Sequence, residues 1–234
     1  MAHDFRTPAD RRRFWLTHAG WPAAAFLAAS VLIATLDLDR RITHAWYYDL
    51  VHGTWLGEGS GAWWARDLLH SAGRWLVRLV ALAALIAWLV TRFRRRAAFA
   101  LLAILLATGI VGGLKAVTNV DCPWDLEEFN GDRPYIGLFA DRPAGLPHAR
   151  CFPGAHASSG FAMMFGYFLL RDSSRRWARR ALAGGLLVGL LFSLGQEARG
   201  AHFVSHDLTS AAVVWFVQLV LYRAMLVPAS PSTE

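Results

Sequence analysis

Three histidines in the C-terminal half of the chain have the spacing that nucleophilic and acid–base chemistry needs. His156 follows a Pro-Gly turn at the start of an apolar run, and His202 and His206 share one face if a helix begins there. A neutral imidazole can attack phosphorus as a covalent nucleophile, and a protonated one can give a proton to a leaving oxygen. His206 is placed to hold the second ring nitrogen of His202, as the third member of a triad does. The pattern indicates phosphoryl transfer.

Two cations accompany these histidines. Lys115 is the one lysine among 24 basic residues, and it lies near the end of an apolar run, where a charge is costly unless it faces a cavity or a partner. Arg199 lies three residues before His202. A lysine and an arginine together neutralise a dianionic phosphate, and arginine can bind it bidentately. We therefore expect Lys115 and Arg199 to bind phosphate.

The elements that must position these side chains are long apolar runs. Hydrophobic residues make up 55% of the 234 residues, and the mean hydropathy is +0.32, which is unusual for a soluble domain. A membrane-spanning helix needs about 20 mostly apolar residues. The first run has no small-residue cleavage site after it, so we expect a span and not a signal peptide. The sequence predicts one all-α domain over residues 1–234, a six-transmembrane-helix bundle with spans at 16–36, 73–91, 97–117, 156–170, 181–200 and 203–225.

Clustered arginines give the expected orientation. Three clusters fall on one side of a six-helix chain, and the positive-inside rule makes that side cytoplasmic. Residues 1–15 and 226–234 are then cytoplasmic, and the histidines face the periplasmic side of a bacterial inner membrane. This topology accounts for the net charge of +7 without binding of nucleic acid. The clusters are Arg6, Arg11, Arg12 and Arg13; Arg92, Arg94, Arg95 and Arg96; and Arg171, Arg175, Arg176, Arg179 and Arg180.

The expected periplasmic segment 37–72 is rich in tryptophan and tyrosine. Such side chains settle at the depth of the lipid headgroups. We expect this segment to form short helices along the membrane interface that anchor the protein. A role in admitting a lipid substrate is the alternative.

Both cysteines fall in the expected outer loop 118–155. An oxidising compartment favours a disulfide between Cys122 and Cys151. Closing a loop of roughly 30 residues is worth about 3–4 kcal/mol in the chain-entropy model. Two free thiols are the alternative.

Three motifs of the chain resemble those of the type-2 phosphatidic acid phosphatase superfamily, the membrane lipid phosphatases related to vanadium haloperoxidases. The family motifs are Lys-x6-Arg-Pro, Pro-Ser-Gly-His and Arg-x5-His-x3-Asp. The matching stretches here are 115–123, 153–156 and 196–207. They occur in the family order and at one expected membrane face. The resemblance implies that His202 is the phosphate-attacking nucleophile, that His156 protonates the leaving group and that Lys115 binds the phosphate.

The chain departs from the family at two arginines. Cys122 and Gln196 stand in their places. Arg199, one helical turn from Gln196, can replace one of them. Arg150 or Arg133 of the outer loop can supply the other.

The third motif also lacks the family aspartate at its usual place. Aligned on His202, the sequence either replaces it by His206 or displaces it to Asp207. An alternative register makes His206 the nucleophile, with Arg199 seven residues before it. We prefer His202, because Gly200-Ala-His-Phe resembles the Gly-x-His-aromatic stretch typical of these enzymes.

The resemblance implies a periplasm-facing lipid phosphatase that works through a phosphohistidine. Its substrate would be an isoprenoid pyrophosphate, the phosphate of lipid A or a glycerophospholipid phosphate. A lipid phosphotransferase of the same superfamily and a catalytically degenerate lipid-binding protein are the alternatives. We expect the bilayer and a phosphorylated lipid as partners and neither a cofactor nor a metal, and the sequence leaves the oligomeric state open.

A membrane b-type cytochrome is a candidate from another class. His156 with His202 or His206 would be the axial haem ligands. This interpretation explains paired histidines on neighbouring helices, but it leaves Lys115 and Arg199 without a role. It also needs histidines at mid-membrane, whereas these lie at helix ends.

Overall fold

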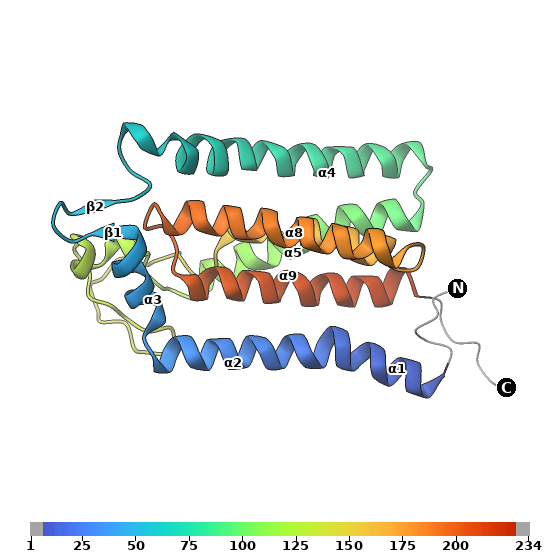
Figure 1. Cartoon of the computed structure of the whole chain (residues 1–234), viewed down its shortest axis with the longest axis horizontal. Coiled ribbons are helices and arrows are strands. Elements are labelled where there is room, and N and C mark those ends of the chain that lie inside the picture. Colours follow the sequence, from blue (N-terminus) through green and yellow to red (C-terminus); the bar gives the residue numbers. More distant parts are fainter. Residues whose placement is uncertain (1–6, 228–234) are drawn as a thin grey trace.

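The computed structural model describes residues 7–227, and in that part of the chain five helices are long and apolar enough to cross a membrane. Figure 1 shows the long helices side by side along the longest axis of the molecule. The protein is therefore mostly helical and has the make-up of a multi-pass membrane protein. The five helices are Pro8–Thr35, Ser60–Val90, Arg95–Val117, Arg175–Glu197 and Val204–Met225.

Two of these helices are composite. The first joins α1 (Pro8–Trp15) to α2 (Trp21–Thr35) through a π-helical turn. The second joins a 3₁₀ turn at Ser60–Ala62 and a π-helix at Trp64–Ala72 to α4 (Gly73–Val90). The other three are α5 (Arg95–Val117), α8 (Arg175–Glu197) and α9 (Val204–Met225). Arg6 and the expected cytoplasmic tail from residue 228 onward lie outside the described residues.

The expected fourth span is helical but interrupted. It consists of α6 (Ala155–Phe161), a 3₁₀ turn and α7 (Phe165–Leu170). Ala157, Phe161 and Met164 are buried in one cluster with side chains of α5 and α9. This stretch therefore runs inside the bundle, and the structure places five long apolar helices around it where the sequence predicts six spans.

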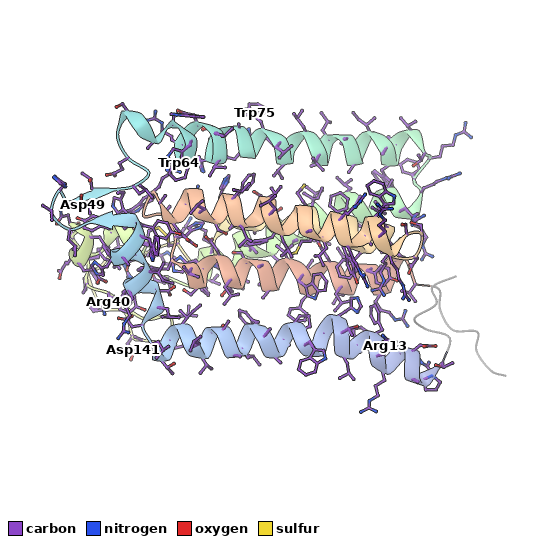
Figure 2. All side chains as sticks on the ribbon, in the orientation of Figure 1. Arg13, Arg40, Asp49, Trp64, Trp75 and Asp141 are labelled. Carbon is purple, nitrogen blue, oxygen red and sulfur yellow. A yellow bond between two sulfur atoms is a disulfide. The ribbon has the colours of Figure 1, made fainter. Side chains whose placement is uncertain are left out.

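The faces of α5 show how the bundle packs. Ala100, Ala103 and Ala107 recur at helical spacing and are buried, whereas Ile110 is 43% exposed. Small residues allow close approach of a neighbouring helix, which here is α9. Exposed apolar side chains contact lipid in a membrane, so their exposure carries no hydrophobic cost there. Trp75 on α4, 62% exposed, likewise points away from the bundle (Figure 2).

Glycines bring α6 and α8 into direct contact. A Cβ at Gly160 would lie 2.9 Å from the Cα of Gly189, and a Cβ at Gly189 would lie 2.1 Å from the ring of Phe161. No methyl group fits between the two helices at this point. The contact fixes α6, which carries His156 in its first turn, against α8.

We expect Gly189→Ala to destabilise the protein by about 1–3 kcal/mol, because the added methyl group overpacks the contact with Phe161. Gly184→Ala, on the same helix, is the matched control, since its Cβ meets nothing within 4 Å. That variant should be neutral or gain up to about 1 kcal/mol from helix propensity. Thermal unfolding in detergent measures both, and equal midpoints for the two variants would refute the close contact.

The described residues of the three arginine clusters lie together at one end of the molecule. The start of α1, the turn between α4 and α5 and the turn between α7 and α8 all meet there (Figure 1). The opposite end carries α3 (Leu38–Ile42), a hairpin and the long segment between α5 and α6. The three arginine clusters therefore lie on one side of the bundle, as the sequence predicts.

The segment expected to form short interfacial helices does so only in its first part, where α3 is followed by a π-helix at Thr43–Tyr47. Residues 60–72 continue into α4, and a hairpin follows α3, with β1 (Tyr48–Asp49) antiparallel to β2 (Thr54–Trp55). Tyr48 and Trp55 are only 5% and 6% exposed, so they are not membrane anchors. They pack against Leu126, Phe129 and Phe203 in one buried cluster. The hairpin therefore covers part of the segment between α5 and α6. Trp46 and Trp63 are exposed.

The long segment between α5 and α6 is held by a disulfide and an ion cluster. Cys122 and Cys151 are bonded, the pairing that the sequence favours. Asp121 is buried and accepts hydrogen bonds from Arg142 at 2.5 and 2.9 Å and from Arg133 at 2.8 Å. Burial alone would raise the pKa of Asp121, but the two arginines outweigh it and hold the pKa below 3.8.

We expect Asp121→Asn to destabilise this segment by about 2–3 kcal/mol. That is less than for a fully buried pair, because both arginines keep partial access to water. Since the folded-state pKa lies below the unfolded value, the stabilisation is present above pH ~3.9 and is lost as pH falls through the folded-state pKa. Protease cleavage within residues 118–154 measures it. Asp132→Asn, at an exposed carboxylate, is the control, and equal cleavage of both variants would contradict the assignment.

Candidate active site

The sequence-predicted site residues gather at the end of the bundle opposite the arginine clusters (Figure 1). Lys115 lies in the last turn of α5, His156 in the first turn of α6 and His206 in the first turn of α9. Arg199 and His202 lie in the turn between α8 and α9. Four helix ends therefore contribute to one region.

A Schellman motif ends α8 just before the predicted nucleophile. The N–H of Gly200 donates to the carbonyl of Glu197, and the N–H of Ala201 donates to that of Gln196, both at 2.9 Å. Gly200 has a φ of +69°, and a Cβ there would lie 2.5 Å from the ring of Trp55. Only glycine fits both requirements, so this residue determines where the chain leaves the helix.

Neighbouring segments brace the same turn. The N–H of Gly57, after the hairpin, donates to the carbonyl of Ala198 at 2.7 Å. The N–H of Trp124, next to the disulfide, donates to the carbonyl of Gly200 at 2.9 Å. The turn that carries His202 is thus tied to both outer segments and is held rigidly.

His202 is oriented by Asp207. The side chains of both residues are 4% exposed, and Nδ1–H of His202 donates to Oδ1 of Asp207 at 2.7 Å. A Cβ at Gly154, in the second motif, would lie 2.1 Å from that carboxylate oxygen and 2.7 Å from the imidazole. The second motif therefore packs directly on the pair.

The His202 imidazole is neutral. Burial lowers the pKa of His202 to about 3, and the positive charges of Lys115 and Arg199 act in the same direction. Because Nδ1 carries the proton that Asp207 accepts, Nε2 keeps its lone pair. This is the form of histidine that can attack an electrophile.

Further polar groups stand behind Asp207. The side chains of Ser193 and Glu197 lie next to its carboxylate, and the hydroxyl of Tyr47 interacts with Glu197. Burial and the neighbouring Glu197 raise the pKa of Tyr47, so its phenol stays protonated and donates. A chain of buried polar groups thus runs from His202 to the hairpin region.

The expectation that His206 holds the second ring nitrogen of His202 is wrong in its geometry. His206 is buried edge-on between Phe152 and Phe203, and its ring centre is 6.1 Å from that of His202. The reason is that α9 begins at Val204, so residues 202 and 206 do not share a helical face. The extended residue before α9 instead brings Asp207, the alternative that the sequence left open, onto Nδ1.

His156 has partners that the sequence did not indicate. Its Nε2–H donates to the carbonyl oxygen of Leu69 at 3.0 Å, and its ring stacks on that of Phe192 with 4.6 Å between the ring centres. His70 lies 4.6 Å away between ring centres and is bonded through Nδ1 to the amide of Gln196 at 2.9 Å. The sequence places the second span from residue 73, whereas the helix begins at Ser60 and so brings His70 to the site.

Several cations act on the two site histidines. Lys115 is electrostatically coupled to His202 and Asp207, and Arg74, in the first turn of α4, is coupled to Arg199 and His156. Arg66, on the same composite helix, also acts on Arg199, so Arg66 and Arg74 both add positive charge near the site, and spacing along the chain gave no reason to select either.

The other two arginines named from the sequence belong to the segment between α5 and α6. Arg133 is paired with Asp121 and Asp125, and Arg150 is exposed in the outer segment. Within residues 7–227, Glu197 makes no ion pair with Arg199 or Lys115 and instead adjoins Asp207. The structure thus brings His202, His156, Lys115 and Arg199 into one region and holds Arg133 in the ion cluster of the outer segment.

Comparison with protein-family models gives a match that includes the site. Residues 96–227, more than half of the chain, match the family model described as the PAP2 superfamily. The matched part begins with α5 and includes Lys115, His156 and the turn that carries His202. No curated protein and no solved structure matches the chain at a significant level.

Proposed function

Because the chain belongs to the PAP2 superfamily, a family of phosphatases and phosphotransferases of the lipid type, we propose that it is a lipid phosphate phosphohydrolase acting through a phosphohistidine at His202. The observation that carries the proposal is the hydrogen bond from His202 to Asp207. It fixes the tautomer in which Nε2 is unprotonated, and burial keeps the ring neutral. An oriented, neutral imidazole is an activated nucleophile.

The proposed reaction has two steps. Nε2 of His202 attacks phosphorus, the bond from phosphorus to the leaving oxygen breaks, and His156 gives that oxygen a proton. Water then attacks the phosphohistidine while His156, neutral after the first step, accepts a proton from it. The phosphorus–nitrogen bond breaks, its electron pair returns to Nε2 of His202 and inorganic phosphate leaves. Asp207 stabilises the positive charge that the ring gains in the first step, as the carboxylate of a triad does. His206 is a packing residue between two aromatic rings in this mechanism.

The charges of the substrate need cationic partners. We assign the phosphate oxygens to Lys115 and Arg199, since both are coupled to His202. Arg74 is our choice for the second family arginine that this chain lacks, ahead of the exposed Arg150, because Arg74 is coupled to both Arg199 and His156.

The proposal includes a membrane orientation. We propose six passes through a bacterial inner membrane, both termini cytoplasmic and the site periplasmic. The arginine clusters at the end away from His202 support this orientation through the positive-inside rule (Figure 1). The disulfide beside the site fits an oxidising compartment.

The test is release of inorganic phosphate by the purified full-length protein. The panel contains an isoprenoid pyrophosphate, a lipid A phosphate and a glycerophospholipid phosphate, with the His202→Ala protein as the blank. Release from one class, absent from the blank, supports the proposal and names the substrate. If phosphate appears only on an added second lipid, the enzyme is a phosphotransferase. If neither product forms with any donor, the proposed activity is refuted and a lipid-binding role remains.

A further inference from the structure

Glu197 is a buried acid that the proposed reaction does not use. It is the last residue of α8, and Asp207 lies in the first turn of α9. Both residues are buried, and their carboxyl groups are in hydrogen-bonding contact. Two carboxyl groups in such a contact cannot both be charged, because like charges repel strongly away from water. The pair therefore holds one proton.

The second oxygen of Asp207 lacks a donor. Oδ1 receives Nδ1–H of His202 at 2.7 Å, whereas Oδ2 is buried and no N–H or hydroxyl in the described part of the chain donates to it. Ser193 lies next to this carboxylate, but its hydroxyl proton goes to the carbonyl of Gly189 at 3.0 Å. A buried acceptor without a donor costs free energy. The O–H of a protonated Glu197 would satisfy it.

The charges around the pair decide which member carries the proton. Asp207 is coupled to the positive charge of Lys115 and accepts the hydrogen bond from His202, and both interactions favour an ionised Asp207. Glu197 is coupled to the negative charge of Asp39, on α3, which disfavours an ionised Glu197. The proton therefore belongs on Glu197.

Tyr47 completes the chain on the other side of Glu197. Burial raises the pKa of the Tyr47 phenol, so this hydroxyl stays protonated and donates to Glu197. A protonated carboxyl group has one O–H to donate and an oxygen that still accepts. Glu197 can therefore accept from Tyr47 and donate to Asp207 at once, whereas an ionised Glu197 could only accept.

We propose that Glu197 is a positioning residue for the nucleophile: it carries a proton, gives a hydrogen bond to Oδ2 of Asp207 and so holds the carboxylate that orients His202. The hydrogen bonds then run in one direction, from Tyr47 to Glu197 to Asp207. Asp207 keeps a single negative charge, which offsets the positive charge of the His202 ring in the first step. The inference rests on the proposed function for its effect on turnover, but not for the protonation of Glu197.

The protonation is tested by infrared spectroscopy of the purified full-length protein in a detergent without ester groups. A protonated carboxyl group has a carbonyl stretch that a carboxylate lacks. We expect this band in the unchanged protein at neutral pH and its loss in Glu197→Gln. Glu128→Gln is the matched control and should keep the band, because Glu128 is a carboxylate paired with Arg40 at 2.9 Å.

This measurement does not depend on activity. A band that is absent from the unchanged protein, or that survives in Glu197→Gln, would overturn the inference even if the protein hydrolyses lipid phosphates. A band that is lost only with Glu197 would support it even if no phosphate is released, and the proposed function alone would then fail.

The positioning role is tested by two substitutions of Glu197. Glu197→Leu removes both hydrogen bonds and leaves Oδ2 of Asp207 without a donor. Its kcat should fall roughly 10–100-fold with little change in KM, the scale known for groups that orient a metal ligand from behind. Glu197→Gln offers an N–H to Asp207 and a carbonyl oxygen to Tyr47, as the protonated acid does, so it should keep most of the kcat.

The pH profile of kcat/KM separates an orienting role from an effect of charge. Glu197→Gln should leave the profile in place, because it replaces one neutral group with another. If Glu197 were ionised, its replacement would remove a negative charge near His202, lower the pKa of that histidine and shift the profile to lower pH. Such a shift, or equal kcat values for Glu197→Leu and the unchanged protein, would exclude the positioning role. Should Glu197→Leu fail to fold, the infrared band and the pH profile of Glu197→Gln still decide.

Discussion

His202→Ala is expected to abolish phosphate release, with a loss on the order of 10⁶ in turnover, the scale seen when the nucleophile of a serine protease is removed. The physical reason is that the Nε2 lone pair of His202 forms the bond to phosphorus, and no other group in the proposed mechanism can replace it. The variant should keep its fold, because His202 lies in a turn and alanine removes its bond to Asp207 while leaving the direct contacts between the long helices in place. Phosphate release at matched expression measures the effect.

A second measurement identifies the covalent bond. Protein quenched with denaturant during turnover of a ³²P-labelled lipid phosphate should retain label in an acid-labile, base-stable form, as expected for phosphohistidine. His202→Ala should retain none. His148→Ala is the control, because it removes a histidine from an exposed position in the outer segment. If His202→Ala stays active and labelled while His206→Ala is inactive, His206 is the nucleophile and the assignment is wrong.

The helical architecture was predictable because it follows from hydropathy. Long apolar runs cannot stay in water, and the bilayer sets the length that they need. The start of the second helix was not predictable in this way, because residues 60–72 include charged side chains that a count of apolar residues excludes. Their helix is continuous with α4 because backbone hydrogen bonding extends past the apolar run. That extension carries His70 to the site.

The hairpin shows a second limit of prediction from the sequence. Tyr48 and Trp55 resemble membrane anchors when only their residue types are considered. Their burial depends on Phe129 and Phe203, which lie far away in the sequence. Composition indicates that an aromatic side chain prefers an interface, but only the packing partner decides whether that interface is lipid or protein.

The site residues also divide into those that the sequence indicates and those whose place depends on packing. His202, His156 and Lys115 were identified from the sequence because the family motifs specify them. Arg74 and Tyr47 were not, because their approach depends on how α4 and the hairpin pack against α8. The choice between His206 and Asp207 needed the three-dimensional path of a turn, since counting residues assumes that a helix begins before it does.

Asp207→Asn is the second change with a large expected effect. The carboxylate accepts the Nδ1 proton of His202, whereas an asparagine in the same place can donate its own N–H to Nδ1. The ring proton then moves to Nε2, and the nucleophile loses its lone pair. A loss of about 10⁴ in turnover is expected, the size that a wrong histidine tautomer causes in the serine protease triad.

Kinetics separate this role from a structural one. The effect of Asp207→Asn should fall on kcat, with KM changed little, because Asp207 interacts with the nucleophile and not with the substrate. Formation of the labelled phosphohistidine should slow in proportion. A variant with normal kcat and a raised KM would contradict the orienting role.

Two neighbouring variants distinguish Asp207 from the groups around it. Glu197→Gln keeps the size and a hydrogen-bonding side chain beside Asp207 while removing one acid from the buried chain that ends at Tyr47. It should lower kcat far less than Asp207→Asn, because it does not touch His202. His206→Ala removes a ring packed between Phe152 and Phe203, so it should lower the melting temperature and leave kcat nearly unchanged. If His206→Ala instead reduces kcat as strongly as Asp207→Asn at unchanged stability, both residues orient His202, and the single hydrogen bond at 2.7 Å is not sufficient to explain how the nucleophile is held.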